Sequence, residues 1–193
     1  DTPVVITLTG SDTESCELTF AILSPPSNGS LGTITNNACT PGSPNTDSAT
    51  VTYTPDPDSF GPDSFSYRVT DADTDFDDAS VSITVNSVND LPTADDKAVA
   101  TDEDTPVLIT LSGSDVESCE LSFATAGPTN GSLGSITNNA CTPGSPNTDS
   151  ATVTFTPNPG VCTPSQGSFT YTTNDGTDTS ASATVTIDIN CVP

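Results

Sequence analysis

The feature that most constrains this chain is that it repeats its own opening. Residues 104–123 read DTPVLITLSGSDVESCELSF, and residues 1–20 read DTPVVITLTGSDTESCELTF. An acidic, proline-containing connector that begins at Asn86 joins the two copies. With 193 residues in total, each copy has roughly 90–100 residues, which is enough for one β-sandwich core. The sequence therefore predicts two tandem domains, at residues 1–88 and 89–193.

Both copies consist of short segments in which apolar residues alternate with Thr or Ser. This period of two, interrupted by Gly, Pro and Asn, indicates β-strands joined by turns. In the first copy we expect strands at residues 3–9, 16–23, 29–35, 48–54, 63–70 and 79–86, with loops at 36–47 and 71–78. Many short strands without a helical period predict an all-β fold made of two β-sandwich domains.

The first copy lacks one segment that the second copy has. Aligning the copies sets Asp1 against Asp104, so residues 97–103, KAVATDE, have no counterpart in the first copy. We interpret this segment as the first strand of the second domain. Two explanations stay open: a neighbouring repeat has been trimmed away, or the first domain has an open sheet edge. An open edge invites pairing with another chain, and the corresponding hypothesis is head-to-tail pairing with a neighbouring subunit.

The charge of the chain excludes several classes of function. There are 26 acidic residues against 2 basic ones, which gives a net charge of -24. Nucleic-acid binding is excluded because nothing neutralises the phosphates, and attachment to an anionic membrane fails for the same reason. No segment approaches the apolar length of a membrane span. A surface with such an excess of acidic residues either binds cations or serves as a solubilising, salt-adapted surface.

The cysteines predict a disulfide framework. Two cysteines at matching positions in both copies indicate one bridge within each copy, and two further cysteines occur only in the second copy. The predicted bridges are Cys16–Cys39, Cys119–Cys141 and Cys162–Cys191. Each closed loop is worth on the order of 3 kcal/mol in the chain-entropy model. Zinc is disfavoured because there is no CxxC spacing and no His. We therefore expect an oxidising environment, extracellular or at the cell surface.

Four segments carry a resemblance to a known family: VNDLPTADD from Val88, TDEDTPVLITLSGSD from Thr101, TVTFTPNP from Thr152 and FTYTTNDG from Phe169. They resemble bacterial cadherin-like tandem repeats, which are immunoglobulin-like β-sandwiches of large extracellular surface proteins and adhesins. The resemblance covers nearly the whole chain. It implies two tandem immunoglobulin- or cadherin-like β-sandwich domains, the first of which lacks its first strand.

Cadherin-type repeats bind calcium at the junction between successive domains, so the resemblance implies calcium ligands at the matching positions. In the connector and the second copy these are Asn89, Asp90, Glu103, Asp115, Glu117 and Asp175, and in the first copy Asp12, Glu14 and Asp71. Calcium prefers carboxylate and carbonyl oxygens, which loops at adjoining domain ends can supply. The alternative is that these Asp and Asn residues only shape turns.

The sequence gives little support for catalysis or for N-glycosylation. Without His, a Ser-His-Asp or Cys-His catalytic site is impossible, and we expect no enzyme. Asn28 and Asn130 each begin an Asn-Gly-Ser sequence, which fits an N-glycosylation acceptor or, as we prefer, a plain hairpin turn.

The expected function is structural. We expect a repeat module of an extracellular fibre, stalk or filament, stiffened by calcium between domains and by disulfides within them. Its expected partners are other copies or neighbouring repeats, joined head to tail in a homopolymer, with glycans as a further partner class. The alternative is an adhesin module that recognises a glycan or a host surface protein. The loop at residues 159–167, PGVCTPSQG, is unique to the second copy and is the candidate region for that alternative.

Overall fold

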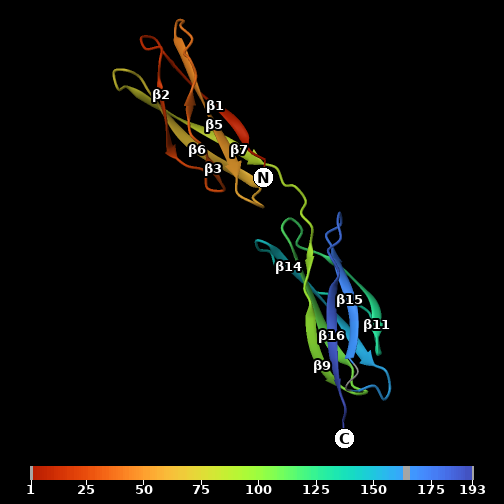
Figure 1. Cartoon of the computed structure of the whole chain (residues 1–193). Helices are drawn as coiled ribbons and strands as arrows, with labels where there is room; N and C mark the ends of the chain where they lie inside the picture. Colours follow the sequence, from red (N-terminus) through yellow and green to blue (C-terminus); the bar gives the residue numbers. More distant parts are fainter. Residues whose placement is uncertain (1, 163–165, 193) are drawn as a thin grey trace. The chain divides into compact units, whose positions relative to one another are not determined.

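The computed structural model describes residues 2–162 and 166–192. The chain forms two compact units, Asp1–Ser87 and Val88–Pro193, so the division falls one residue earlier than the boundary in the sequence prediction. Every regular element in the described residues is a β-strand (Figure 1), which confirms the all-β prediction. Within the same residues, no helix has the length and apolar character needed to cross a membrane.

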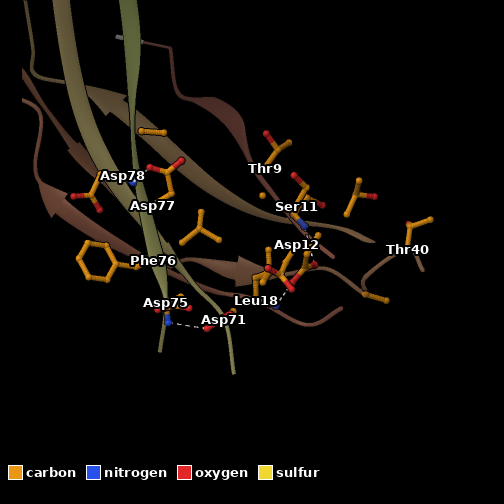
Figure 2. Close-up of a pocket in the computed structure, with 17 residues that line it drawn as sticks. Thr9, Ser11, Asp12, Leu18, Thr40, Asp71, Asp75, Phe76, Asp77 and Asp78 are labelled. Atoms are coloured by element: carbon orange, nitrogen blue, oxygen red, sulfur yellow. Dashed lines mark hydrogen bonds between the residues drawn. The ribbon is translucent and has the colours of Figure 1, made fainter. Parts of the chain in front are cut away.

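The first domain contains two antiparallel sheets. One sheet has the order β1-β5-β3, with β4 also paired to β5, and the other has the order β2-β6-β7. The bounds are β1 (Val4–Asp12), β2 (Thr19–Ser24), β3 (Gly29–Leu31), β4 (Thr35–Asn36), β5 (Asn45–Pro55), β6 (Gly61–Thr70) and β7 (Phe76–Val85). A cavity of about 700 Å³ opens between the two sheets, lined by residues of β1, β5, β6 and β7 (Figure 2).

The second domain repeats these seven strands and adds two. The repeated strands are β10 (Val107–Asp115), β11 (Ser122–Thr129), β12 (Gly131–Leu133), β13 (Thr137–Asn138), β14 (Asn147–Pro157), β15 (Gln166–Asn174) and β16 (Ala183–Asn190). The additional strands are β8 (Thr93–Ala94) and β9 (Lys97–Asp102). β8 pairs with β10 in one sheet, whereas β9 pairs in parallel with β16 in the other. The predicted first strand is therefore present, and the segment that contains it crosses from one sheet to the other.

Two stretches that were predicted to be loops are partly strand. β1 continues to Asp12 and β5 begins at Asn45, because the antiparallel register continues through Gly10↔Asp47 to Asp12↔Asn45. The carboxylate of Asp47 lies buried there and accepts a hydrogen bond from the Leu18 backbone N–H at 2.8 Å. Polar residues that indicated a turn are thus held in the sheet by a buried hydrogen bond. The prediction of a loop over all of residues 36–47 is wrong at both ends, because β4 includes Asn36 and β5 begins at Asn45.

The acidic loop at residues 71–78 is also shorter than predicted, because β7 begins at Phe76. Arg68 on β6 forms two hydrogen bonds with the Asp78 carboxylate, at 2.7 and 2.8 Å. Its guanidinium also lies over the Phe76 ring, 3.6 Å from the centroid. These contacts between neighbouring strands hold the acidic residues in an extended conformation, since a bidentate ion pair and a cation–π contact both need the strands side by side.

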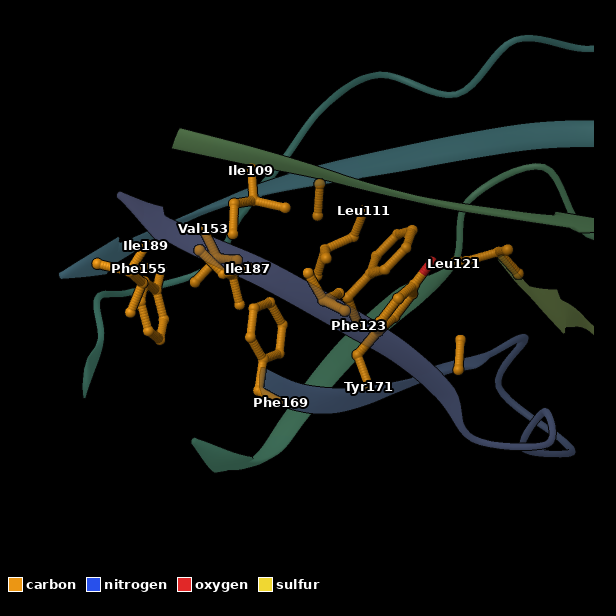
Figure 3. Packing of buried hydrophobic residues seen from close by; sticks show 13 residues of the cluster. Ile109, Leu111, Leu121, Phe123, Val153, Phe155, Phe169, Tyr171, Ile187 and Ile189 are labelled. Carbon is orange, nitrogen blue, oxygen red and sulfur yellow. The ribbon is translucent and has the colours of Figure 1, made fainter. Parts of the chain in front are cut away.

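Each domain has its own apolar core between its sheets. In the second domain the core includes Phe155, Phe169 and Tyr171, with Ile187 from β16 (Figure 3). The first domain has the matching cluster around Leu8, Phe65 and Tyr67. As the alternation of residues 63–70 predicted, Phe65 and Tyr67 point inward and are buried. The period-two pattern thus placed the inward face of this strand correctly.

Candidate functional site

Three loop segments meet at one end of the second domain. The Asn89 side-chain amide donates hydrogen bonds to Asp175 Oδ2 at 3.0 Å and to Asp178 Oδ2 at 3.1 Å. The Asp90 backbone N–H donates to Glu117 Oε2 at 3.0 Å. The connector, the turn after β10 and the loop between β15 and β16 therefore come together. We call the residues at this end the acidic group: Asn89, Asp90, Asp115, Glu117, Asp175 and Asp178. It contains all the predicted metal ligands of this domain except Glu103, and it adds Asp178, which the sequence prediction missed.

Two tight turns shape the acidic group. Asp115 ends β10, and its Oδ1 accepts the backbone N–H groups of Glu117 at 3.0 Å and Ser118 at 2.5 Å. Asp175 follows β15, and its Oδ1 accepts the N–H groups of Thr177 and Asp178, both at 2.6 Å. These are Asx-type turns, in which one carboxylate oxygen orders the following backbone. The predicted turn role of the acids is therefore real, and it leaves the second oxygen of each carboxylate for other contacts.

The turn at Asp175 also keeps that carboxylate ionised. The backbone N–H groups of Asp178 and Thr177, together with the Asn89 amide, lower the pKa of the Asp175 carboxyl below its ordinary value. Hydrogen bonds that favour the charged form of an acid have this effect. The group therefore presents a carboxylate, which is the form that a hard cation needs.

Asp115 is the most unusual member of the acidic group. It is only 3% exposed, and its Oδ2 has no hydrogen-bond partner within the described part of the chain. A buried carboxylate oxygen without a partner is costly, on the order of 1–3 kcal/mol or more. A calcium ion is a partner of the right kind, since it binds carboxylate, amide and backbone oxygens. The residues therefore fit calcium in chemical type. However, no three acidic or cysteine side chains among the described residues converge into a ready metal cluster.

The predicted ligand Glu103 lies elsewhere. Its backbone N–H donates to the Asn190 carbonyl at 2.8 Å, and its Oε1 accepts the Val192 N–H at 2.8 Å. Because β9 runs parallel to β16, Glu103 lies at the end of the sheet where β16 finishes, whereas Asp175 precedes the start of β16. The structure thus does not bring Glu103 together with the other predicted ligands of this domain. Its carboxylate instead fixes the end of the chain after β16.

The first-domain ligands form the same turns. Asp12 Oδ1 accepts the backbone N–H groups of Glu14 at 2.8 Å and Ser15 at 2.5 Å. Asp71 Oδ1 accepts those of Asp73 at 3.0 Å and Asp75 at 2.8 Å. Asp12 and Asp71 both line the cavity in Figure 2. No residue of the described first domain corresponds to Asn89, so the amide link between the two turns is found in the second domain only.

The structure contains the three predicted disulfides. Cys16–Cys39 and Cys119–Cys141 span 5.7 and 5.6 Å between Cα atoms and tie the turn before β2 or β11 to the loop before β5 or β14. Cys162–Cys191 joins the loop after β14 to the residue after β16, with 4.9 Å between Cα atoms. It therefore clamps the terminal strand. Residues 163–165 of the candidate recognition loop lie outside the described residues.

The two Asn-Gly-Ser sequences lie in the short connections from β2 to β3 and from β11 to β12. The strands that each connection joins pair in different sheets, so the prediction of a plain hairpin turn is wrong. Asn130 adopts a φ of 56°, in the left-handed region that tight turns use, and its Nδ2 donates to the Gln166 carbonyl at 2.7 Å. Asn28 is exposed, and its backbone N–H donates to Asp63 Oδ2 at 3.1 Å. Both residues therefore belong to tight crossings between the sheets, and glycosylation stays a prediction.

Sequence reasoning missed a buried acid in the first domain. Asp63 Oδ2 accepts the Tyr53 hydroxyl at 2.9 Å, and its carboxylate also accepts backbone N–H groups of Ser27, Asn28 and Ser64. Burial tends to raise the pKa of this carboxyl, but the hydrogen bonds lower it to about 2. Burial and the Asp63 charge raise the pKa of Tyr53 to about 12. The available signal was the phase of the strand, because Asp63 alternates in step with Phe65 and Tyr67.

Comparison with known proteins gives a family and a set of distant structural neighbours. The model described as "Bacterial Ig domain" matches residues 1–84 and 89–188. Titin domains z1z2 in complex with telethonin are 8% identical, with a TM-score of 0.35, and the alignment covers 98% of this chain and 89% of that one. Domains 4 and 5 of the S-layer protein SbsC are 15% identical, with a TM-score of 0.27, and cover 72% and 62%. No curated protein sequence matches significantly.

The family match coincides with the duplicated architecture. One match falls on each compact unit, and each unit has two facing sheets around one core. The match covers more than half of the chain, and no catalytic family is indicated. Bacterial immunoglobulin-like domains are typically extracellular, which agrees with the three disulfides. The chain therefore belongs to the bacterial Ig domain family and carries two of its domains in tandem.

Proposed function

We propose that this chain is a structural repeat module of an extracellular fibre, stalk or filament. The observation that carries the proposal is the duplication itself: the same disulfide-stapled sandwich occurs twice, with nearly the same loops. A module that recognises a specific partner needs a loop surface that its spacer neighbours lack. Repetition of one stable unit instead supplies length, and the bridges stabilise each unit against unfolding. The module joins its neighbours head to tail.

Calcium is the second part of the proposal. It binds at the acidic group of the second domain, where Asp115, Glu117 and Asp175 would supply carboxylates and Asn89 an amide oxygen. A bound calcium ion would supply the positive charge that this end of the domain lacks. The support is the buried Asp115 Oδ2 without a partner, next to carboxylates that two Asx turns hold in place. Fixing the connector residue Asn89 to these turns would stiffen the path of the chain into the domain.

The test is thermal unfolding of the full chain with calcium and then with a chelator, under oxidising conditions that keep the bridges. Calcium at 100 times its dissociation constant adds about 2.7 kcal/mol for one site. That corresponds to an increase of about 10 °C or more in the unfolding midpoint of the second domain. An unchanged midpoint at millimolar calcium contradicts the calcium proposal and leaves the disulfides and packing as the source of stability.

The decisive variant is Asp115→Asn. Asparagine keeps the Oδ1 that accepts the Glu117 and Ser118 N–H groups, and it replaces only the oxygen that has no partner. We expect the variant to fold, to be at least as stable as the parent in chelator, and to lose the response to calcium. The matched control is Glu103→Gln at the opposite end of the domain, which should keep the full response. An equal loss of response in both variants would contradict the assignment of the site.

A further inference from the structure

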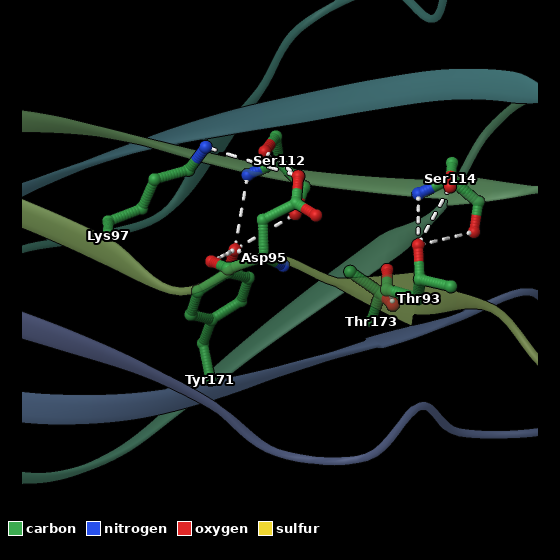
Figure 4. A network of polar contacts seen from close by, with 7 residues as sticks. All are labelled: Thr93, Asp95, Lys97, Ser112, Ser114, Tyr171 and Thr173. Carbon is green, nitrogen blue, oxygen red and sulfur yellow. Dashed lines mark hydrogen bonds and ion pairs between the residues drawn. The ribbon is translucent and has the colours of Figure 1, made fainter.

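The segment of residues 93–102 completes the second domain by bridging its two sheets. On one side, the Thr93 carbonyl accepts the Thr173 hydroxyl at 2.9 Å, and the Thr93 side chain pairs with Ser114 (Figure 4). The Tyr171 hydroxyl lies 2.6 Å from the Asp95 carbonyl oxygen and 2.9 Å from that of Ser112. The inserted backbone is thus fixed by side chains from both sheets.

The second half of the same segment covers the outer strand. β9 pairs with β16 from Lys97↔Val185 to Asp102↔Asn190. Val99 packs against the core, and Thr101 is buried. As a result Val185, Ile187 and Ile189 of β16 are all 0% exposed.

The first domain has surfaces that match those covered by β8 and β9 in the second domain. No described residues of the first domain cover these surfaces. Its cavity is lined by Thr9, Gly10, Ser11 and Val69, which correspond through the strand registers to Ser112, Gly113, Ser114 and Thr173. In the second domain these positions surround Thr93 and Ala94. Similarly, Val81, Ile83 and Val85 of β7 correspond to the three buried residues of β16, yet each is only half-buried.

Glycine at one position makes room for an incoming backbone. A Cβ on Gly113 would lie 2.5 Å from the Thr93 carbonyl oxygen, so only glycine permits the close approach of β8. Gly10 has the same place in the first domain. The three atoms nearest to a Cβ on Gly10 all belong to the Leu18 and Val69 side chains, and none is a backbone atom. The first domain therefore has the clearance that β8 needs.

We propose that the first domain binds an extended peptide strand of the type seen at residues 93–102, supplied by the connector of another repeat. The strand adds antiparallel to β1 near Gly10 and then runs parallel to β7, and its central apolar residue covers Val81 and Ile83. This is strand addition to an open sheet edge, in which backbone hydrogen bonds give affinity and alternate side chains give specificity. The proposal rests on the head-to-tail assembly above and names the surface through which it occurs.

The charges predict how such binding responds to salt. The cavity and its rim carry the carboxylates of Asp12, Asp47, Asp71, Asp75, Asp77 and Asp78. The segment at residues 93–102 is itself acidic, with three Asp residues and one Lys. Like charges repel, and salt screens the repulsion over about 8–10 Å at physiological ionic strength. Affinity for the strand should therefore increase with salt.

The experiment adds a synthetic peptide of residues 91–103, LPTADDKAVATDE, to the full 193-residue chain. Hydrogen exchange is followed residue by residue by NMR. We expect at least about tenfold slower exchange at the outer edge of β7, since a new ladder must open before its amides exchange. A spin label at the peptide position of Ala94 should broaden the NMR signals of Thr9 and Gly10. This broadening would show in which direction the peptide lies along the domain.

The control is the same peptide with Val99→Asp, which would place a charge against the core and should bind at least about tenfold more weakly, a difference of 1.4 kcal/mol. Equal protection by both peptides, or no protection of β7 at about 1 mM peptide, a weak-binding limit, would overturn the proposal. Protection or broadening confined to the second domain would overturn it too. The calcium experiment measures the second domain, whereas the peptide experiment measures the first. A negative result for strand binding can therefore be told apart from a negative result for the proposed calcium-stiffened module.

Discussion

The two domains have almost the same sequence and strand order, but they bury their outer strands differently. In the second domain β9 covers β16, and the three inward residues of β16 are completely buried. In the first domain the matching residues of β7 are half-buried, and a cavity lies at the start of the same strand. The difference shows that one connector segment, outside the repeated core, determines whether the sandwich is closed.

A second difference lies at the opposite end of the core. The Tyr53–Asp63 pair of the first domain corresponds to Phe155 and Gly167 in the second. A Cβ on Gly167 would lie 2.7 Å from the Phe155 ring, so Phe155 excludes an acid there. The hydroxyl and its carboxylate partner are therefore both present or both replaced. A buried polar pair of this kind is kept or lost as a unit, because either group alone lacks its partner.

The largest expected effect tests the covering of β16 by β9. Ile187→Ala should destabilise the second domain by about 2–5 kcal/mol, because it leaves a cavity under β9. Ile83→Ala at the matching position of the first domain should cost less, on the order of 1 kcal/mol, since the side chain is already partly solvated. Denaturant unfolding with NMR signals from each domain measures both values. Equal losses would mean that β9 adds nothing to the burial of β16.

The next effect concerns acid and base. The folded pKa of Asp63 is lowered to about 2 from its ordinary 3.8, so its contribution is present above about pH 4 and is lost as the pH falls towards 2. The pKa of Tyr53 is raised to about 12 from 10.0, so the neutral hydroxyl contributes below pH 10 and that contribution is lost as the pH rises towards 12.

The matching variant is Asp63→Asn, which should destabilise the first domain by about 1–3 kcal/mol at neutral pH, because it removes an acceptor from several buried donors. It should also flatten the dependence of that domain's stability on pH between 4 and 2. The second domain, which has Gly167 at this position, serves as the internal reference. An unaltered pH profile in the variant would show that other carboxylates govern the response to acid.

The smallest effect compares the single cation of each domain. Arg68 forms a bidentate pair with Asp78 and stacks on Phe76. Lys97 Nζ lies 4.0 Å from Asp95 Oδ2, and within the described part of the chain it has no second contact of that kind. Lys97→Met should therefore change stability by less than about 0.5 kcal/mol, as exposed ion pairs usually do. Arg68→Met should destabilise its own domain by more than Lys97→Met destabilises the second domain, and it should therefore lower the unfolding midpoint further. The reverse order in a calorimetric scan would contradict the value assigned to the Arg68 contacts.

Much of the fold followed from local patterns. The duplicated stretch predicted two domains, and the alternation along residues 48–54 and 63–70 predicted strands with Phe65 and Tyr67 inside. The recurrence of Cys16 and Cys39 as Cys119 and Cys141 predicted their bridges. Strand ends were less predictable, because residues such as Asp47 favour turns locally but are held in the sheet by a donor distant in the sequence.

The sequence by itself determined the β-sandwich class, the tandem arrangement, the disulfide pairs and the acidic turns, since each depends on residue type and spacing along the chain. Only the tertiary structure decided which acids meet: it joined Asp178 to Asn89, left Asp115 Oδ2 buried without a partner and placed Glu103 at the far end of the sheet. Only the tertiary structure, likewise, showed the first domain's cavity. These features depend on strand register and on packing between segments distant in the chain, which no local pattern specifies.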